Sequence, residues 1–86
     1  MENNIEVLKF SATWCGPCRV LAQTLKDVPG ITNIDVDKDN ETPAKYGIRS
    51  VPTLVFLKDG KEVHRQSGNM PLTMYNQILD EIKLNK

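Results

Sequence analysis

The chain has 86 residues, of which 40% are hydrophobic and 26% are charged, and its eleven basic residues balance its eleven acidic ones. This balance argues against a general electrostatic attraction to nucleic acid or to an anionic membrane, and no apolar run approaches the roughly 20 residues of a membrane span. The N-terminus lacks the basic region and apolar core of a signal peptide, so we expect one cytoplasmic domain over residues 1–86.

The first two predicted elements are a strand and a helix on either side of a cysteine. The sequence IEVLKF, residues 5–10, is mostly apolar and is typical of a strand buried on both faces. The helix is expected to begin just after Cys15 and to stop at Pro29-Gly30. Its apolar residues share one helical face, and they are Val20, Leu21, Leu25 and Val28.

The middle of the chain predicts a strand, a short helical turn and another strand. Residues 31–36 and residues 53–57 are rich in β-branched and apolar side chains, which favour strands. Between them, residues 42–46 are expected to form a helical turn that ends at Gly47. Pro52 directly precedes the later strand, a position where proline removes no ladder hydrogen bond.

The C-terminal part predicts a hairpin and a final helix. Asp59-Gly60 is a strong signal for a tight β-hairpin, so residues 61–67, which have mixed polarity, are expected to return as an edge strand. A helix follows Pro71, where apolar residues recur at helical spacing: Tyr75, Ile78, Leu79 and Ile82.

This order of elements predicts an α/β fold with a four-stranded mixed sheet. A right-handed β-α-β crossover makes the first two strands parallel, and the hairpin adds an antiparallel pair. We expect the two long helices to cover one face of the sheet, and only the short helical turn to cover the other.

The sequence TWCGPC, residues 13–18, holds both cysteines of the chain. Cys15 is placed at the N-terminus of the predicted helix, where the macrodipole and unpaired N–H groups stabilise an anion such as a thiolate. Cys18 lies about one helical turn further on, close enough to bridge Cys15 and more sheltered. The sequence therefore predicts a redox pair, in which exposed Cys15 attacks a target disulfide and Cys18 then displaces the reduced target.

Two other uses of the cysteines fit the sequence less well. A bridge across so short a loop removes little entropy from the unfolded chain, so a mainly structural disulfide is not expected. A zinc site needs about four ligands, whereas Cys15, Cys18 and the lone His64 supply only three. We therefore expect no metal and no cofactor beyond the Cys15–Cys18 pair, and a zinc site shared between two chains stays open as an alternative.

The segments WCGPC and KYGIRSVPTLVFLKDGKEV resemble the thioredoxin family, and the similarity runs from about Ile5 to the end of the chain. This resemblance implies the thioredoxin fold, reduction of protein disulfides, and re-reduction by a thioredoxin reductase. It implies Cys15 as the nucleophile and Cys18 as the resolving thiol.

The resemblance also implies roles for residues around the cysteines. Those that would shape the active loop are Trp14, Gly16 and Pro17. Those that would bind an extended substrate are Val51, Pro52 and Gly68, with Pro52 matching the family's cis-proline.

The chain departs from the family in two ways. Typical members begin with an extra strand and helix, which this chain is expected to lack. Where the family usually has a buried aspartate, six residues before the first cysteine, this chain has Lys9, and Asn33 replaces a nearby lysine. Lys9 is thus a candidate pKa modulator, whose charge would favour thiolate and make the couple more oxidising. In the alternative, its stem packs on the sheet while its ammonium reaches water.

Together, these features predict a thiol–disulfide oxidoreductase that reduces protein disulfides through a Cys15/Cys18 dithiol and a mixed-disulfide intermediate. Two alternatives stay open. One is a dedicated electron donor to one enzyme, with a ribonucleotide reductase or glutaredoxin-like role. The other is a non-catalytic binding subunit that uses the surface around Trp14, Val51 and Pro52. The expected partners are disulfide-containing proteins and a thioredoxin reductase, with no nucleic acid or membrane, and the chain is expected to be a monomer.

Overall fold

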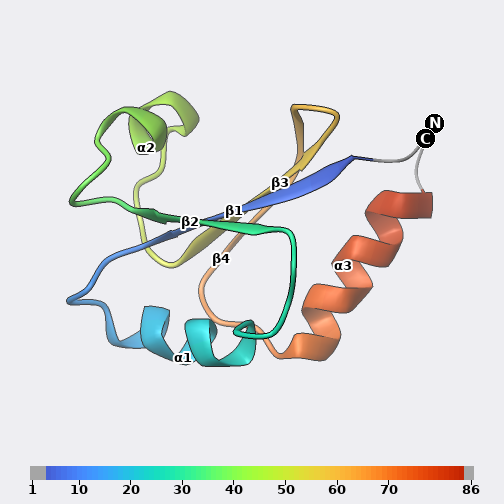
Figure 1. The fold of residues 1–86 in the computed structure, drawn as a ribbon, viewed down its shortest axis with the longest axis horizontal. Coiled ribbons are helices and arrows are strands. Elements are labelled where there is room, and N and C mark those ends of the chain that lie inside the picture. Colours follow the sequence, from blue (N-terminus) through green and yellow to red (C-terminus); the bar gives the residue numbers. More distant parts are fainter. Residues whose placement is uncertain (1–3, 85–86) are drawn as a thin grey trace.

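The computed structural model describes residues 4–84, in which it contains four strands and three helices. In chain order they are β1 Ile5–Ser11, α1 Gly16–Thr24, β2 Ile31–Asp35, α2 Glu41–Tyr46, β3 Thr53–Lys58, β4 Lys61–Ser67 and α3 Leu72–Leu84 (Figure 1). The order of elements agrees with the prediction, and each strand end lies within one residue of its predicted place.

The four strands form one mixed sheet in the order β2-β1-β3-β4. β1 runs parallel to β2, whereas β3 runs antiparallel to both β1 and β4. The β3-β4 hairpin turns at Asp59 and Gly60, whose φ angles are 53° and 85°. A tight hairpin turn of this type requires positive φ at both central residues. The predicted α/β class, the mixed sheet and the hairpin are therefore confirmed.

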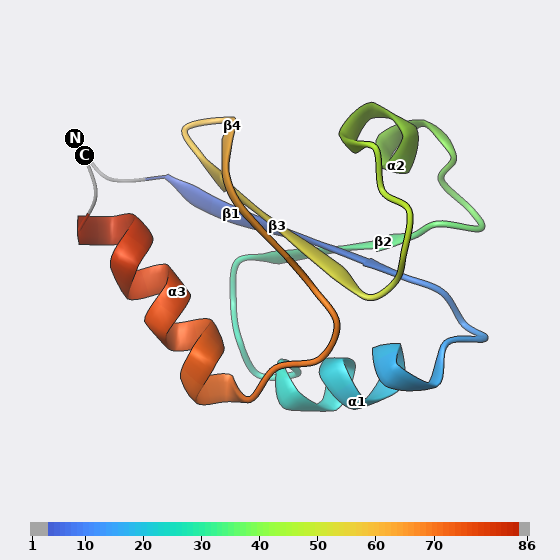
Figure 2. The ribbon, with the colours of Figure 1, turned by 180° about the vertical axis from the view of Figure 1, so that it is seen from behind.

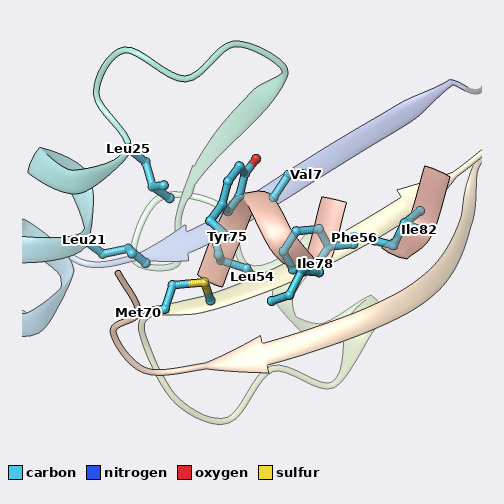
Figure 3. Close-up of a cluster of buried hydrophobic side chains, with 9 residues drawn as sticks. All are labelled: Val7, Leu21, Leu25, Leu54, Phe56, Met70, Tyr75, Ile78 and Ile82. Carbon is cyan, nitrogen blue, oxygen red and sulfur yellow. The ribbon is translucent and has the colours of Figure 1, made fainter. Parts of the chain in front are cut away.

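The helices cover the two faces of the sheet unequally, with α1 and α3 on one face and α2 on the other (Figures 1 and 2). The larger hydrophobic cluster lies under the two long helices. Figure 3 shows its members, which are Val7, Leu21, Leu25, Leu54, Phe56, Met70, Tyr75, Ile78 and Ile82. Most of these side chains come from β1, β3, α1 and α3, whereas Leu25 follows α1 and Met70 precedes α3. Removal of their apolar surface from water therefore holds the four elements together.

A smaller hydrophobic cluster lies on the α2 face of the sheet. Successive side chains of a strand point to opposite faces, so β1 and β3 contribute to both clusters. The buried members here are Leu8, Phe10, Ile34, Val55 and Leu57. Ile48 and Val51 pack against them, which ties the segment before β3 to the sheet.

α1 is shorter than predicted. It ends at Thr24, and Leu25 is its C-cap residue. The chain then turns, with the N–H of Val28 donating to the carbonyl of Leu25 at 3.0 Å. The turn brings Gly30 to the sheet, where its carbonyl accepts a hydrogen bond from the N–H of Val7 at 3.1 Å. The predicted end of the helix at Pro29-Gly30 is therefore wrong, because pairing with β1 requires an earlier turn.

The prediction that Val20 shares the buried face of α1 is also wrong. Val20 is 58% exposed, whereas the next residue, Leu21, is fully buried. Adjacent helical residues point about 100° apart, so the orientation that buries Leu21 turns Val20 toward solvent.

Candidate active site

The cysteine motif lies where β1 leads into α1. β1 ends at Ser11, and α1 starts at Gly16 with Cys15 as its N-cap residue. The backbone of Cys15 is extended, with φ −95° and ψ 110°. Pro17 stands in the first turn, where its missing N–H costs no helical hydrogen bond. The predicted position of Cys15 at the amino end of a helix is confirmed.

The end of the helix provides a positive environment for the Cys15 sulfur. The backbone N–H of Cys18 donates to Sγ of Cys15 at 3.1 Å, and the first turn of α1 carries no acidic side chain. Both the hydrogen bond and the helix macrodipole stabilise negative charge at this atom. After reduction, the same groups favour a thiolate on Cys15.

Cys15 and Cys18 form a disulfide, and their Cα atoms lie 5.3 Å apart. The two residues are 5% and 4% exposed. The predicted contrast between an exposed Cys15 and a sheltered Cys18 is therefore wrong for the oxidised protein. The bridge holds both sulfurs together, and the pair packs with Ala12 against Val36 and Val51.

The loop residues beside the disulfide are exposed. Trp14 is 67% exposed, and Gly16 and Pro17 are exposed as well. The indole Nε1 of Trp14 donates to Oδ2 of Asp37 at 2.9 Å, which holds the ring in place without burying it. The sequence did not identify Asp37, because several acidic residues follow β2 and no local pattern distinguishes the one that reaches the indole.

A second loop lies against the disulfide. Sγ of Cys15 lies 3.8 Å from the carbonyl oxygen of Val51. A disulfide sulfur carries no proton, so this is a van der Waals contact that only a reduced thiol converts into a hydrogen bond. The Val51–Pro52 peptide bond is cis, and the carbonyl of Pro52 accepts a hydrogen bond from the N–H of Gly68 at 2.9 Å. The fold thus brings Val51, Pro52 and Gly68 together beside the cysteines.

A hollow of about 180 Å³ lies between Trp14 and Val51. Its other lining residues are Val36, Pro43, Ile48, Arg49 and Ser50. A mostly apolar lining with a few polar groups is typical of a binding site. The motif YGIRSVPT pointed to part of this hollow, whereas Val36 and Pro43 join it only through the fold.

Lys9 lies in the middle of β1, on the same side as the active-site helix. It is 8% exposed, and burial lowers its pKa below the ordinary value of 10.5. Lys9 and Cys18 line one cavity of about 470 Å³, together with Ser11, Ala12, Thr13, Arg19, Ala22 and Asp35. Within residues 4–84, the Lys9 ammonium makes no ion pair. Lys9, the candidate pKa modulator, therefore lines the same cavity as Cys18.

Other features lie apart from the cysteines. A larger cavity, of about 580 Å³, lies among the start of β1, the end of α1 and α3, and neither cysteine lines it. His64 packs against Phe56 on β3, with ring centroids 5.5 Å apart. In the part of the chain that the structure describes, no three His, Cys, Asp or Glu side chains gather as metal ligands.

Comparison with known proteins agrees with this geometry. The family model for Thioredoxin matches residues 1–81. Thioredoxins of Staphylococcus epidermidis and Staphylococcus aureus are 36% and 35% identical over 88 residues, which cover 94% of this chain and 85% of theirs. A mutant thioredoxin of Halobacterium salinarum superposes with a TM-score of 0.88 at 29% identity, over 94% of this chain and 76% of that one. The thioredoxin of Fasciola hepatica superposes with a TM-score of 0.77 at 40% identity, over 88% of this chain and 79% of that one.

Proposed function

This chain belongs to the thioredoxin family and is a thiol–disulfide oxidoreductase, and on that premise we propose that it reduces disulfides of other proteins through Cys15 and Cys18. The observation that carries the proposal is the disulfide at the amino end of α1, where the N–H of Cys18 donates to Sγ of Cys15. That arrangement favours an ionised sulfur, and the thiolate is the form of cysteine that attacks a disulfide.

The proposed reaction has two exchange steps. In the reduced protein, the Cys15 thiolate attacks one sulfur of a target disulfide, which forms a mixed disulfide and releases the other target sulfur as a thiolate. Cys18, once deprotonated, attacks Sγ of Cys15 and breaks its bond to the target. The second target thiolate leaves, and both released thiolates take protons from solvent. Two electrons have then moved from the dithiol to the target, and the Cys15–Cys18 disulfide is restored.

The target is proposed to bind across Trp14 and Val51. The exposed indole and the adjoining hollow offer apolar surface to one side chain of an extended segment. Val51, Pro52 and Gly68, which lie together beside the cysteines, are proposed to bind this segment. Trp14, Gly16 and Pro17, which are exposed, are proposed to shape the loop that it meets. A target disulfide placed there lies directly against Cys15.

Lys9 is proposed to favour the thiolate forms of the cysteines and so to make the couple more oxidising. Its place on the cavity that Cys18 also lines supports this role. Lys9→Met keeps the length of the stem and removes the charge. Wild type is expected to form its Cys15 thiolate at lower pH than Lys9→Met, as followed by ultraviolet absorbance. Identical titrations would remove Lys9 from the mechanism.

The setting of the activity is also proposed. The cysteine pair itself carries the electrons, without a bound cofactor, and a thioredoxin reductase restores the dithiol. The chain is proposed to act as a monomeric single domain, residues 1–86, in the cytoplasm. No helix within residues 4–84 has both the length and the apolar character to cross a bilayer.

Reduction of insulin with a supplied thioredoxin reductase tests the proposed function. Wild type is expected to reduce insulin repeatedly when the reductase supplies the electrons. Turnover with glutathione in place of the reductase would instead indicate a glutaredoxin-like role. The double variant Cys15→Ser with Cys18→Ser is expected to be inactive. If the double variant keeps the protein's biological function, the chain is instead a binding subunit that uses the surface around Trp14.

A further inference from the structure

The second exchange step requires that Cys18 lose a proton in a sheltered place. Cys18 lies in the first turn of α1 and is only 4% exposed. Cys18 also lines a cavity of about 470 Å³ that is open to solvent. A proton that leaves the Cys18 thiol can therefore reach an acceptor on the wall of this cavity.

Three charged side chains line the cavity, one from each element around it. They are Lys9 on β1, Arg19 on α1 and Asp35 at the end of β2. A guanidinium has no lone pair available and stays charged, and a protonated amine has none either. Asp35 is the member of this set that, as a carboxylate, accepts a proton at neutral pH.

The position of Asp35 suits an acceptor. Asp35 pairs with Ser11 across the parallel strands, two positions along from the pair formed by Lys9 and Asn33, so it lies on the cavity side of the sheet. Its Oδ1 accepts a hydrogen bond from the N–H of Asp37 at 2.9 Å, which fixes the carboxylate. Among residues 4–84, its Oδ2 has no hydrogen-bond partner. One oxygen thus anchors the side chain while the other stays available.

We propose that Asp35 accepts the proton of Cys18, relayed by water in the cavity, when Cys18 displaces the reduced target. This inference rests on the proposed function. The Cys18 S–H bond breaks as the proton moves to Asp35, the Cys18 sulfur bonds to Sγ of Cys15, and the bond from Cys15 to the target sulfur breaks. The target leaves as a thiolate, and Asp35 returns its proton to solvent. Lys9 balances the negative charge on Cys18 during the step.

Stopped-flow reaction of the reduced protein with dithiobis(nitrobenzoate) separates the two exchange steps. The first coloured thiolate reports attack by Cys15, and the second reports its displacement by Cys18. Asp35→Asn keeps the anchoring acceptor and is expected to slow the second release on the order of 10²-fold while it leaves the first unchanged. The variant is also expected to lose the acid limb of the pH profile for the second release, and Asp35→Glu to restore it in part. Asp80→Asn, an exposed carboxylate on α3, is the matched control.

The outcomes separate the inference from the function beneath it. If wild type releases no second equivalent, the proposed function fails and the role of Asp35 fails with it. If wild type releases both, and Asp35→Asn matches it in rate and pH profile, only the role of Asp35 is overturned. Loss of the acid limb in Lys9→Met, with Asp35→Asn unaffected, would assign the proton to the amine and overturn the inference as well.

Discussion

The Cys15 sulfur lies 3.8 Å from the carbonyl oxygen of Val51, although 36 positions separate the two residues. Antiparallel pairing of β1 with β3 explains this contact. Phe10 near the end of β1 faces Thr53 at the start of β3, so the loop that leaves β1 and the loop that enters β3 meet at one edge of the sheet. A target that reaches Cys15 must therefore also meet the backbone of Val51.

The two cysteines are expected to fail in different ways when each is replaced. Cys18→Ser keeps the attacking thiolate but removes the resolving sulfur, so a mixed disulfide with the target should accumulate. Cys15→Ser should form no adduct. Intact-protein mass spectrometry after incubation with a disulfide-containing protein distinguishes the two, and a stable adduct on Cys18 in Cys15→Ser would reverse the assigned roles.

Lys9→Met is expected to stabilise the protein at neutral pH. Burial lowers the pKa of Lys9 from 10.5, so the folded state binds this proton more weakly than the unfolded state. The free energy of unfolding therefore rises with pH between the lowered pKa and 10.5, and the penalty of burying the charged amine is fully present below the lowered pKa. Urea denaturation of wild type and Lys9→Met at neutral and alkaline pH measures both free energies of unfolding. The difference between them should become smaller as pH rises.

The exposed Lys26 provides the control for this measurement. Lys26→Met removes a lysine charge from an exposed position. The free energy of unfolding of this variant should depend on pH as it does in wild type. A constant gap between wild type and Lys9→Met at every pH would contradict the burial of a charged amine.

Tyr75→Phe is expected to raise the free energy of unfolding by about 1 kcal/mol. Tyr75 is fully buried, and among the described residues its hydroxyl has no hydrogen-bond partner. Burial also raises the pKa of Tyr75 from 10.0 to about 12. The folded state therefore holds this proton more tightly, and wild type loses stability as pH rises from 10.0 toward about 12, whereas Tyr75→Phe does not. A less stable Tyr75→Phe in urea denaturation would mean that the hydroxyl has a partner.

Asp37→Ala is expected to lower kcat/KM for protein disulfides about fivefold, which corresponds to the loss of one hydrogen bond. Oδ2 of Asp37 accepts a hydrogen bond from Nε1 of Trp14 at 2.9 Å. Removal of the carboxylate is expected to let the exposed indole move away from the disulfide. Fluorescence reports the change directly, because Trp14 is the single tryptophan. Asp80→Ala serves as control, and an unchanged kcat/KM with a shifted spectrum would show that the hydrogen bond plays no part in target binding.

Much of the fold could be predicted because its signals are local. Apolar and β-branched runs indicated the buried strands, helical periodicity indicated the two long helices, and turn residues such as Asp59-Gly60 marked the hairpin. The errors lie where packing overrides the local pattern. α1 ends at Thr24 because Gly30 must pair with Val7, and Val20 faces solvent because Leu21 occupies the core.

The sequence by itself determined the chemistry of the site: two thiols one turn apart at the amino end of a helix, because spacing and helix polarity are properties of neighbouring residues. Only the tertiary structure decided what surrounds them. Strand order and register bury Cys15 and bring it against Val51. They also allow the hydrogen bond from Trp14 to Asp37, and they form the cavity that Lys9, Cys18 and Asp35 line. Those arise from pairing between distant segments, which no local pattern encodes.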